Sequence, residues 1–191
     1  MLAIIFMRAK IVKNTPLRCY YCKKELMSRL IKVAQQRGFN TVFEGSNADD
    51  DNDYRPGMRA VKELGVLSPL KNAELTKSEI RRLSKALGLS TYSKPSLACL
   101  ATRIEYDEEI TAQKLRMTDR AEQVLCDLGL TQVRVRMNDN SARIEVPFDE
   151  MKIVFDNVKY INDALKKIGY DFVSLDLEGY KTGKMNININ N

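Results

Sequence analysis

Cysteine is the residue type whose spacing points most directly to chemistry in this sequence. Cys19 and Cys22 form a Cys-x-x-Cys pair, and Cys99 follows far downstream. Two thiolates separated by two residues can bind one metal ion or iron–sulfur cluster, or can cycle between dithiol and disulfide. A third thiol from elsewhere in the chain indicates a cluster with three protein ligands and one open iron.

A second segment, at residues 44–50, has the composition of a nucleotide-binding turn. It reads Glu-Gly-Ser-Asn-Ala-Asp-Asp and follows residues 41–43, which we predict to be a short buried strand. A glycine turn after a strand lets backbone amides approach a nucleotide, and a carboxylate there can hold Mg²⁺. A polar surface turn is the alternative. We predict nucleotide contacts from four residues of this turn: Gly45, Ser46, Asn47 and Asp50.

Two cations flank Cys99 in the sequence. Lys94 and Arg103 could neutralise the phosphates of ATP or of an adenylate, and could lower the pKa of the thiol. Either residue could instead be the partner of a surface ion pair. We predict that both bind the nucleotide.

A pair of arginines marks a candidate substrate site. Arg134 and Arg136 are two residues apart in an alternating segment, so their guanidinium groups should lie on one face of a strand. A planar guanidinium fork suits a phosphate bidentately. Arg143 and Glu145 should extend the same face on the next strand. Ordinary alternation on a half-exposed hairpin is the alternative.

Composition limits the function classes. The chain has 191 residues, a hydrophobic content of 44% and a net charge of +6, so it can fill a core and suits anionic ligands. Its basic residues are scattered, which does not favour nucleic acid as a partner. The absence of histidine excludes histidine bases and ligands. Residues 2–7 are too short an apolar run for a signal or a membrane span, so we expect a cytoplasmic protein with no membrane partner.

The elements that would position these residues fall into two groups. In the first, helices are predicted at residues 23–37 and 58–64 and after a capping box at 76–79, with Ile80, Leu83 and Leu87 facing inward. Helices alternating with short apolar strands indicate an α/β layer on a parallel sheet.

After Arg103 the pattern changes to a small α+β unit. We predict a helix at 111–128 with Cys126 in the core, a hairpin at 132–146, a long helix at 149–168 and a final strand at 172–177. The predicted domains are residues 1–108 and 109–186, followed by a disordered tail at 187–191.

Five segments, in order along the chain, resemble the LarE family. They are residues 14–23 (Asn-Thr-Pro-Leu-Arg-Cys-Tyr-Tyr-Cys-Lys), 44–50, 53–57, 94–103 (Lys-Pro-Ser-Leu-Ala-Cys-Leu-Ala-Thr-Arg) and 176–180. This family comprises ATP-dependent sulfur transferases of nickel-pincer nucleotide cofactor biosynthesis, within the PP-loop ATP pyrophosphatase superfamily. The resemblance implies a PP-loop (adenine nucleotide alpha hydrolase-like) parallel sheet followed by the small α+β domain.

The resemblance also implies a reaction and its cofactors. ATP with Mg²⁺ would adenylylate a pyridinium dicarboxylate mononucleotide, and sulfur would then displace AMP to leave a thiocarboxylate. Cys99 matches the sulfur-carrying position. Members with that cysteine alone donate its own sulfur, whereas members with the Cys-x-x-Cys pair hold a 4Fe–4S cluster. Cys19, Cys22 and Cys99 match the second pattern, so we favour cluster-dependent transfer. Arg134 and Arg136 resemble the family's phosphate-binding arginines, and family members commonly form homo-oligomers.

One family motif has no counterpart in this sequence. Members open with a strand and a Ser-Gly-Gly-x-Asp-Ser pyrophosphate loop, and this motif does not occur here. We therefore expect either a shortened reading frame or a separate polypeptide that supplies this half-site, and little pyrophosphate release from the chain alone. Two further functions stay open: a PP-loop enzyme of tRNA thiolation, and a catalytically incompetent fragment or binding module.

Overall fold

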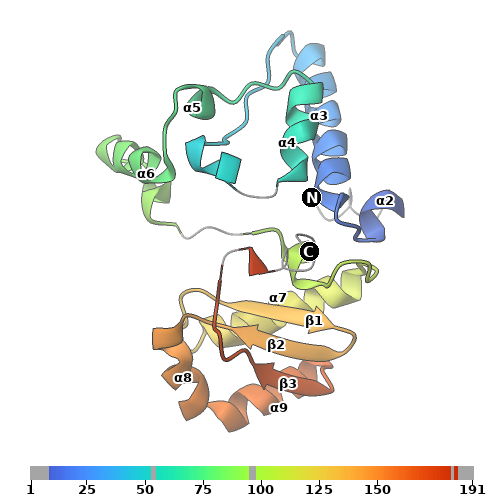
Figure 1. Cartoon of the computed structure of the whole chain (residues 1–191), viewed down its shortest axis with the longest axis vertical. Helices are drawn as coiled ribbons and strands as arrows, with labels where there is room; N and C mark the ends of the chain where they lie inside the picture. Colours follow the sequence, from blue (N-terminus) through green and yellow to red (C-terminus); the bar gives the residue numbers. More distant parts are fainter. Residues whose placement is uncertain (1–8, 53–54, 95–97, 182, 185–191) are drawn as a thin grey trace. The chain divides into compact units, whose positions relative to one another are not determined.

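The computed structural model describes residues 9–52, 55–94, 98–181 and 183–184 (Figure 1). The chain divides into two compact units. The first contains Ala3–Ile11 and Leu17–Ser96, and the second contains Val12–Pro16 and Leu97–Asn191. The second unit therefore includes residues 97–108, which the sequence had placed in the first domain. The tail predicted at 187–191 lies outside the described residues.

The described part of the first unit is helical. Its elements are α2 (Ala9–Val12), α3 (Arg18–Gln36), η1 (Ala48–Asn52), α4 (Pro56–Glu63), α5 (Pro69–Asn72), α6 (Lys77–Ala86) and η2 (Ser90–Ser93). Helix α4 begins at Pro56, where a missing N–H and a fixed φ are tolerated. Helix α3 ends just before Gly38, whose φ of +79° suits glycine.

The short buried strand predicted at residues 41–43 is wrong. Phe43 forms only an isolated parallel bridge with Leu67, and its side chain is 64% exposed. Two backbone hydrogen bonds make this bridge, from Glu44 N to Leu67 O at 2.9 Å and from Leu67 N to Val42 O at 3.0 Å. In the part of this unit that the structure describes, the predicted parallel sheet is reduced to that bridge.

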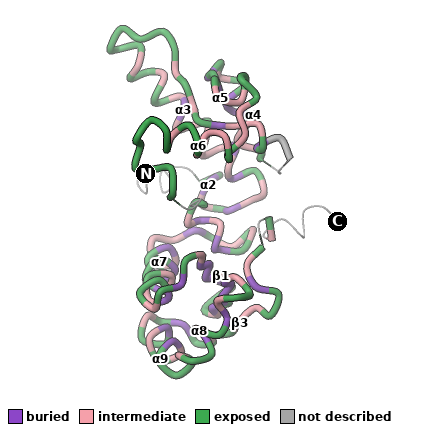
Figure 2. Tube along the Cα trace, turned by 90° about the vertical axis from the view of Figure 1, so that its left-hand side faces the viewer, coloured by how far each residue is buried: buried purple, intermediate pink, exposed green. Residues whose placement is uncertain are grey.

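Helix α6 begins where the sequence predicted. The Thr76 side chain accepts from Glu79 N, and the Glu79 side chain accepts from Thr76 N, which is the expected capping box. The inward orientation of Leu83 and Leu87 is wrong, since they are 45% and 76% exposed. Helix α6 packs against η2 and has no buried residue (Figure 2).

The second unit combines helices with a three-stranded mixed sheet. Its elements are η3 (Leu100–Arg103), α7 (Ala112–Cys126), β1 (Arg134–Asn138), β2 (Ser141–Glu145), η4 (Phe148–Glu150), α8 (Met151–Asp156), α9 (Val158–Ile168) and β3 (Phe172–Leu175). Strands β1 and β2 form the predicted antiparallel hairpin, and β3 pairs parallel with β2. Asp139 in the turn has a φ of +47°, a conformation that Asp and Asn tolerate.

The long helix predicted at 149–168 is interrupted. It forms as η4, α8 and α9, and Asn157 separates the last two with φ −117° and ψ 18°. The Asn157 side-chain amide donates to the carbonyl of Ile153 at 2.8 Å. Asparagine side chains that bond nearby backbone groups compete with helix continuation.

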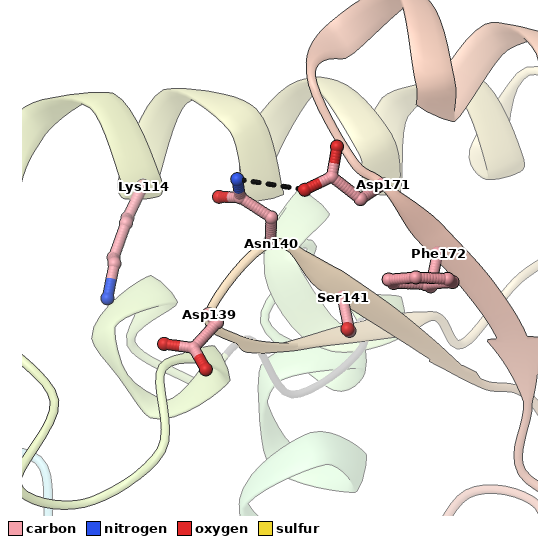
Figure 3. A pocket seen from close by; sticks show the side chains of 6 residues that line it. All are labelled: Lys114, Asp139, Asn140, Ser141, Asp171 and Phe172. Carbon is pink, nitrogen blue, oxygen red and sulfur yellow. Dashed lines mark hydrogen bonds between the residues drawn. The ribbon is translucent and has the colours of Figure 1, made fainter.

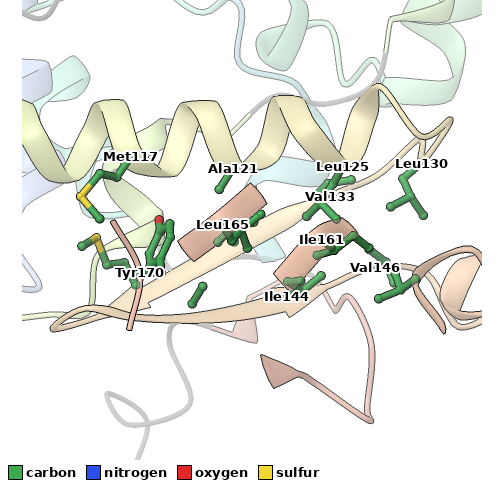
Figure 4. Packing of buried hydrophobic residues seen from close by; sticks show 14 of the residues in the cluster. Met117, Ala121, Leu125, Leu130, Val133, Ile144, Val146, Ile161, Leu165 and Tyr170 are labelled. Atoms are coloured by element: carbon green, nitrogen blue, oxygen red, sulfur yellow. The ribbon is translucent and has the colours of Figure 1, made fainter. Parts of the chain in front are cut away.

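One face of the sheet carries the core. Helix α7 packs on β1 and α9, and α9 packs on β3. Figure 4 shows Ala121 and Leu125 of α7 among Val133, Ile161 and Leu165. The alternation predicted for the hairpin is confirmed, because six apolar side chains on this face are at most 4% exposed: Val133, Val135, Met137, Ala142, Ile144 and Val146.

Candidate functional site

The other face of the sheet is charged, and Glu145 lies at its centre. Glu145 is fully buried, and both of its carboxylate oxygens accept from Nε of Arg136 at 3.1 Å. Arg143 Nη2 lies 3.4 Å from Glu145 Oε1. In the strand register Arg136 is directly opposite Arg143 and Arg134 is opposite Glu145. Glu145 therefore separates two like charges that would otherwise face each other.

Residues after β3 extend this charged network. Asp176 Oδ2 lies 3.5 Å from Arg143 Nε and 2.7 Å from Lys184 Nζ. The Lys184 side chain is only 7% exposed. Burial raises the pKa of Asp176, but hydrogen bonds from Lys184 and from the Glu178 amide outweigh burial and lower it. Asp176 is therefore ionised. It lies at the edge of the charged face of the sheet that carries Arg134, Arg136 and Arg143, which we call the arginine face.

Arg134 is the most buried arginine of the strand pair, at 5% exposure. Its Nη1 donates to the carbonyl of Val133 at 2.7 Å, and its guanidinium lies 5.2 Å from the ring centroid of Tyr180. Burial, then the charges of Arg103 and Arg136, lower the pKa of Arg134. A cation crowded by other cations in a partly dry site favours the approach of an anion.

The segment that carries Cys99 is tied to this arginine face. Cys99 is exposed and precedes η3 as its N-cap residue. Its carbonyl accepts from Thr102 N at 2.9 Å and from Arg103 Nη1 at 3.4 Å. Arg136 Nη1 donates to the carbonyl of Thr102 at 2.6 Å. The backbone of Cys99 and the side chains of Arg103 and Arg136 thus share one hydrogen-bonded framework.

Arg103 is 3% exposed and forms a bidentate pair with Glu122 of α7. Nε and Nη2 of Arg103 donate to the two carboxylate oxygens of Glu122 at 2.7 and 3.0 Å. Glu122 also accepts from the backbone amide of Val135 at 3.0 Å. Glu122 was missed in the sequence, where it looks like any acidic residue on an amphipathic helix.

Lys94 belongs to the first unit, whereas Arg103 belongs to the second. Lys94 is exposed, and its carbonyl accepts from Nη2 of Arg81 at 2.5 Å. The two residues predicted on either side of Cys99 therefore make their hydrogen bonds in different units, Lys94 with Arg81 and Arg103 with Glu122.

The predicted nucleotide-binding turn is organised by Glu44, for which no role was predicted from the sequence. The Glu44 side chain is 6% exposed and accepts from Ser46 N at 3.1 Å, from Ser68 Oγ at 2.5 Å and from Lys23 Nζ at 3.2 Å. Burial raises the pKa of Glu44, but these three hydrogen bonds together lower it to about 2. The position of Glu44 directly after an apolar segment was the signal available.

The remainder of this turn is closed by short-range contacts. Asp50 Oδ2 accepts from the amide of Asn47 at 3.0 Å, and Asp50 Oδ1 pairs with Arg55 at 2.8 Å. The amide of Asp49 donates to the Asn47 side chain at 3.0 Å. At Gly45 an added Cβ would meet nothing within 4 Å, so the backbone there is open to a ligand. Gly45, Ser46, Asn47 and Asp50 thus form one compact loop.

Cys19 and Cys22 lie in the first turns of α3, and both are half-buried. Arg18 Nη2 lies 3.5 Å from Cys19 Sγ. Within each unit, the described residues contain no group of three or more Cys, Asp or Glu side chains that could hold a metal ion. The third predicted ligand, Cys99, belongs to the other unit.

A polar clamp beside this cysteine pair joins α3 to α4. Glu63 accepts from Tyr20 Oη at 2.7 Å, from Lys24 Nζ at 2.9 Å and from Arg59 Nε at 2.8 Å. The hydrogen bond from Lys24, then those from Tyr20 and Arg59, lower the pKa of Glu63 to about 2. The clamp was not predicted, because Glu63 lies 39 and 43 residues from Lys24 and Tyr20, its partners on α3.

The prediction that Cys126 lies in the core is wrong. Cys126 is the last residue of α7 and is exposed. Leu125, its neighbour in the sequence, is fully buried and takes the core position instead.

A surface pocket of about 410 Å³ lies at the turn of the hairpin (Figure 3). The Asn140 side chain donates to Asp171 at 3.1 Å across one side of it. None of the predicted site residues lines this pocket, whose residues are Lys114, Asp139, Asn140, Ser141, Asp171 and Phe172. Among the helices that the structure describes, none has the length and apolar character needed to cross a membrane.

The fold and this site define a mixed helix-and-strand protein with an arginine-rich sheet face and an exposed cysteine. No protein-family model matches the chain. It is 44% identical over 175 residues to the uncharacterized protein slr1717 of Synechocystis, covering 91% of this chain and 65% of that protein. It is 36% identical over 178 residues to the pyridinium-3,5-bisthiocarboxylic acid mononucleotide synthase of Lactiplantibacillus plantarum, covering 92% and 64%.

A third relative is the uncharacterized protein MJ0830 of Methanocaldococcus jannaschii, which is 34% identical over 173 residues, covering 91% of this chain and 68% of that protein. The chain thus spans about two thirds of the length of these curated relatives. It belongs to their family, and its similarity to the named synthase supports the LarE-like assignment made from the motifs.

Proposed function

We propose that this chain takes part in ATP-dependent sulfur transfer, converting a pyridinium dicarboxylate mononucleotide to its thiocarboxylate in nickel-pincer nucleotide cofactor biosynthesis. The observation that carries the proposal is the double role of Arg136, which bonds both Glu145 on the arginine face and the carbonyl of Thr102 beside Cys99. A phosphate held on that face would bring its carboxylate-bearing ring to the same framework as the thiol. The name of the relative from L. plantarum supplies the substrate class.

The chemistry follows from the weakness of a carboxylate as an electrophile. A carboxylate oxygen attacks the α-phosphorus of ATP, so pyrophosphate leaves and an acyl adenylate forms. A sulfur nucleophile then attacks the acyl carbon, and AMP departs with the electron pair of the broken C–O bond. When Cys99 itself is the nucleophile, the thioester loses its cysteine by β-elimination, which leaves a thiocarboxylate and dehydroalanine. Sulfur is a strong nucleophile near neutral pH only as the thiolate.

Nucleotide binding is assigned to the turn anchored by Glu44. Gly45, Ser46 and Asn47 would offer backbone donors to the nucleotide, and Asp50 would hold Mg²⁺. Lys94 and Arg103 would balance phosphate charge. In this proposal the first unit belongs to a PP-loop domain, and the protein works as a homo-oligomer.

The cysteine residues suit a 4Fe–4S cluster in their chemistry. Cys19 and Cys22 are three positions apart on α3 and so share one face of that helix. With Cys99 they would supply three thiolates and leave one iron open. When bound, such a cluster could provide an expendable sulfide.

The proposal is tested first by sulfur transfer. The chain is reconstituted with iron and sulfide and supplemented with a polypeptide that carries the Ser-Gly-Gly-x-Asp-Ser loop. It is then incubated anaerobically with ATP, Mg²⁺ and the dicarboxylate mononucleotide, and the nucleotide is analysed by mass spectrometry for replacement of oxygen by sulfur. Cys99→Ser should abolish the thiocarboxylate. Cys126→Ser, which changes another exposed cysteine, should not. Transfer by Cys99→Ser at the wild-type rate would exclude Cys99 as the sulfur carrier.

Substrate binding is tested separately by calorimetry. Arg134→Lys keeps a positive charge but loses the planar fork, and it should weaken mononucleotide binding about tenfold. Arg120→Lys makes the same change at an exposed position of α7 and should have no effect. A wild-type chain that does not bind the mononucleotide would contradict the proposed function.

A further inference from the structure

A strap follows the sheet and covers part of the arginine face. We define the strap as residues 176–181 with 183–184, which follow β3. Tyr180 N donates to the carbonyl of Val146, beyond the end of β2, at 2.8 Å. Gly179 is buried with a φ of +68°, and a Cβ added there would lie 2.8 Å from the same carbonyl oxygen. Only glycine fits this contact, so the backbone of the strap is held against β2.

The far end of the strap is fastened by charge. Lys184 pairs with Asp176 at 2.7 Å and with Glu178 at 3.1 Å, and it also donates to the carbonyl of Gly179 at 3.4 Å. These contacts tie the end of the strap back to its start, and the Lys184 side chain is largely buried. The strap is thus attached to the sheet at two points, by the pair of Asp176 with Arg143 and by the hydrogen bond from the Tyr180 amide to Val146.

The side chain that the strap presents to the arginine face is Tyr180. Its ring lies 5.2 Å from the guanidinium carbon of Arg134. The amide of Gln132, turned so that its oxygen faces Arg134, accepts from Nη2 at 3.0 Å and from Nη1 at 3.3 Å. An aromatic face and an amide oxygen together restrict a side chain that has many rotamers.

We infer that Tyr180 is a positioning residue that fixes the Arg134 guanidinium for recognition of the 5′-phosphate of the mononucleotide. The inference rests on the proposed function, because it names how the same site selects a phosphorylated ligand. The ring lies 5.2 Å from the guanidinium carbon and, together with the Gln132 amide, limits the orientations of the guanidinium fork. A fixed fork loses less entropy on binding than a mobile one. The strap therefore acts on selectivity through Arg134, without a contact to the reacting carboxylate.

The first experiment compares two ligands, the mononucleotide and its dephosphorylated nucleoside, by calorimetry. Tyr180→Leu should weaken binding of the mononucleotide about 3- to 30-fold, the range of a partly buried cation–π contact. Binding of the nucleoside should not change. Tyr180→Phe keeps the ring and should restore the affinity for the mononucleotide. Tyr160→Leu, at a tyrosine of α9 that is 55% exposed, is the matched control.

A double-mutant cycle tests whether Tyr180 acts through Arg134. Adding Tyr180→Leu to Arg134→Lys should weaken mononucleotide binding by no more than about twofold beyond the single Arg134→Lys change. Equal losses for both ligands, a Phe variant that behaves like the Leu variant, or additive effects would each overturn the inference.

A second variant changes the position of Tyr180 by altering the backbone of the strap at Gly179. Gly179→Ala should displace the strap and give the same selective loss of mononucleotide affinity, because its Cβ meets the Val146 carbonyl. Gly183→Ala is the matched control, since Gly183 also has a positive φ, of +80°, but an added Cβ there meets nothing within 4 Å.

A ligand-free measurement keeps this inference separate from the proposed function. The Nε–H resonance of Arg134, assigned by its loss in Arg134→Lys, should shift in Tyr180→Leu because the ring current of the tyrosine is removed. An unchanged resonance would overturn the inference even if the mononucleotide binds. A wild-type chain that binds neither ligand would overturn the proposed function, while the resonance would still show whether Tyr180 fixes Arg134.

Discussion

Glu44 in the first unit and Glu145 in the second are both buried carboxylates that organise a candidate site, but their partners differ. Glu44 accepts from a backbone amide, a hydroxyl and a lysine. Glu145 is surrounded by guanidinium groups from its own hairpin, those of Arg136 and Arg143. The contacts of Glu44 fix the conformation of the 44–50 loop. The carboxylate of Glu145 neutralises part of the positive charge of the arginine face, which keeps a net positive charge that can attract an anion.

The two units also differ in the size of their buried hydrophobic clusters. The second unit has one continuous buried cluster of fifteen residues, drawn from α7, the sheet, α8 and α9 and from adjoining segments. In the described part of the first unit, one cluster has three buried members, Met27, Val61 and Val66, and further buried apolar residues such as Tyr20 and Ala60 are not part of it. A small apolar cluster stabilises little, so polar contacts such as the Glu44 and Glu63 networks carry more of the order there. We expect the two units to respond differently to the same kind of substitution.

The largest expected effect is in the core of the second unit. Leu165→Ala removes a side chain that is fully buried and should lower the free energy of unfolding by about 4 kcal/mol. Urea denaturation measures this change. Leu177→Ala, at a residue that is 77% exposed, should cost less than about 0.5 kcal/mol. If Val61→Ala in the first unit costs as much as Leu165→Ala, the contrast between the cores is wrong.

The second effect concerns Glu145. Glu145→Gln leaves Arg136 and Arg143 close together without the negative charge between them, and should cost about 3 kcal/mol of stability. Because the destabilisation is repulsive, a high concentration of salt should recover part of it. Thermal unfolding at low and high salt provides the measurement. Stability that does not depend on salt in this variant would mean that Glu145 acts mainly by packing.

The third effect is a pH dependence of the first unit. The pKa of Glu44 is lowered to about 2, so its ionised form stabilises the folded state above the ordinary carboxyl pKa. This contribution, roughly 2–3 kcal/mol, should be lost as the pH falls from about 4.5 toward 2. The protection of the 44–50 loop from hydrogen exchange, relative to the intrinsic exchange rate at each pH, should therefore fall over that range.

The variant Glu44→Gln should already exchange fast at neutral pH and should show a flatter pH profile. Glu109→Gln, at an exposed glutamate, is the control and should keep the wild-type profile. The same acid sensitivity in Glu44→Gln would assign the pH dependence to another carboxylate.

The smallest expected effect is the loss of a helix cap. Thr76→Ala removes the side-chain acceptor of the capping box and should destabilise α6 by about 1 kcal/mol. Exchange of the first α6 amides should report this loss. Arg82→Ala, at an exposed position in the same helix, should leave those amides protected. An effect of Thr76→Ala that spreads over the whole first unit would show that α6 is coupled more strongly than its lack of buried residues suggests.

Several elements could be predicted because their signals are local. Alternation of Val135 with Arg134 and Arg136, followed by an Asn-Asp-Asn turn, predicted the hairpin and the face on which each side chain lies. The pair Thr76 and Glu79 predicted the start of α6 through contacts three residues apart. The predictions of burial at Phe43, Leu83 and Cys126 were wrong, because the burial of a side chain depends on which distant segments of the chain pack against it.

The sequence by itself determined the chemical inventory of this protein: three cysteines in a suggestive order, an arginine pair on one strand face, and a glycine turn after an apolar segment. Tertiary structure alone decided how these groups are held. Glu122, 19 residues from Arg103, takes that arginine as a bidentate partner, and Tyr180 reaches Arg134 from 46 residues away. The physical reason is that charge and aromatic contacts act over a few ångströms in space, and only the folded chain sets which residues come that close.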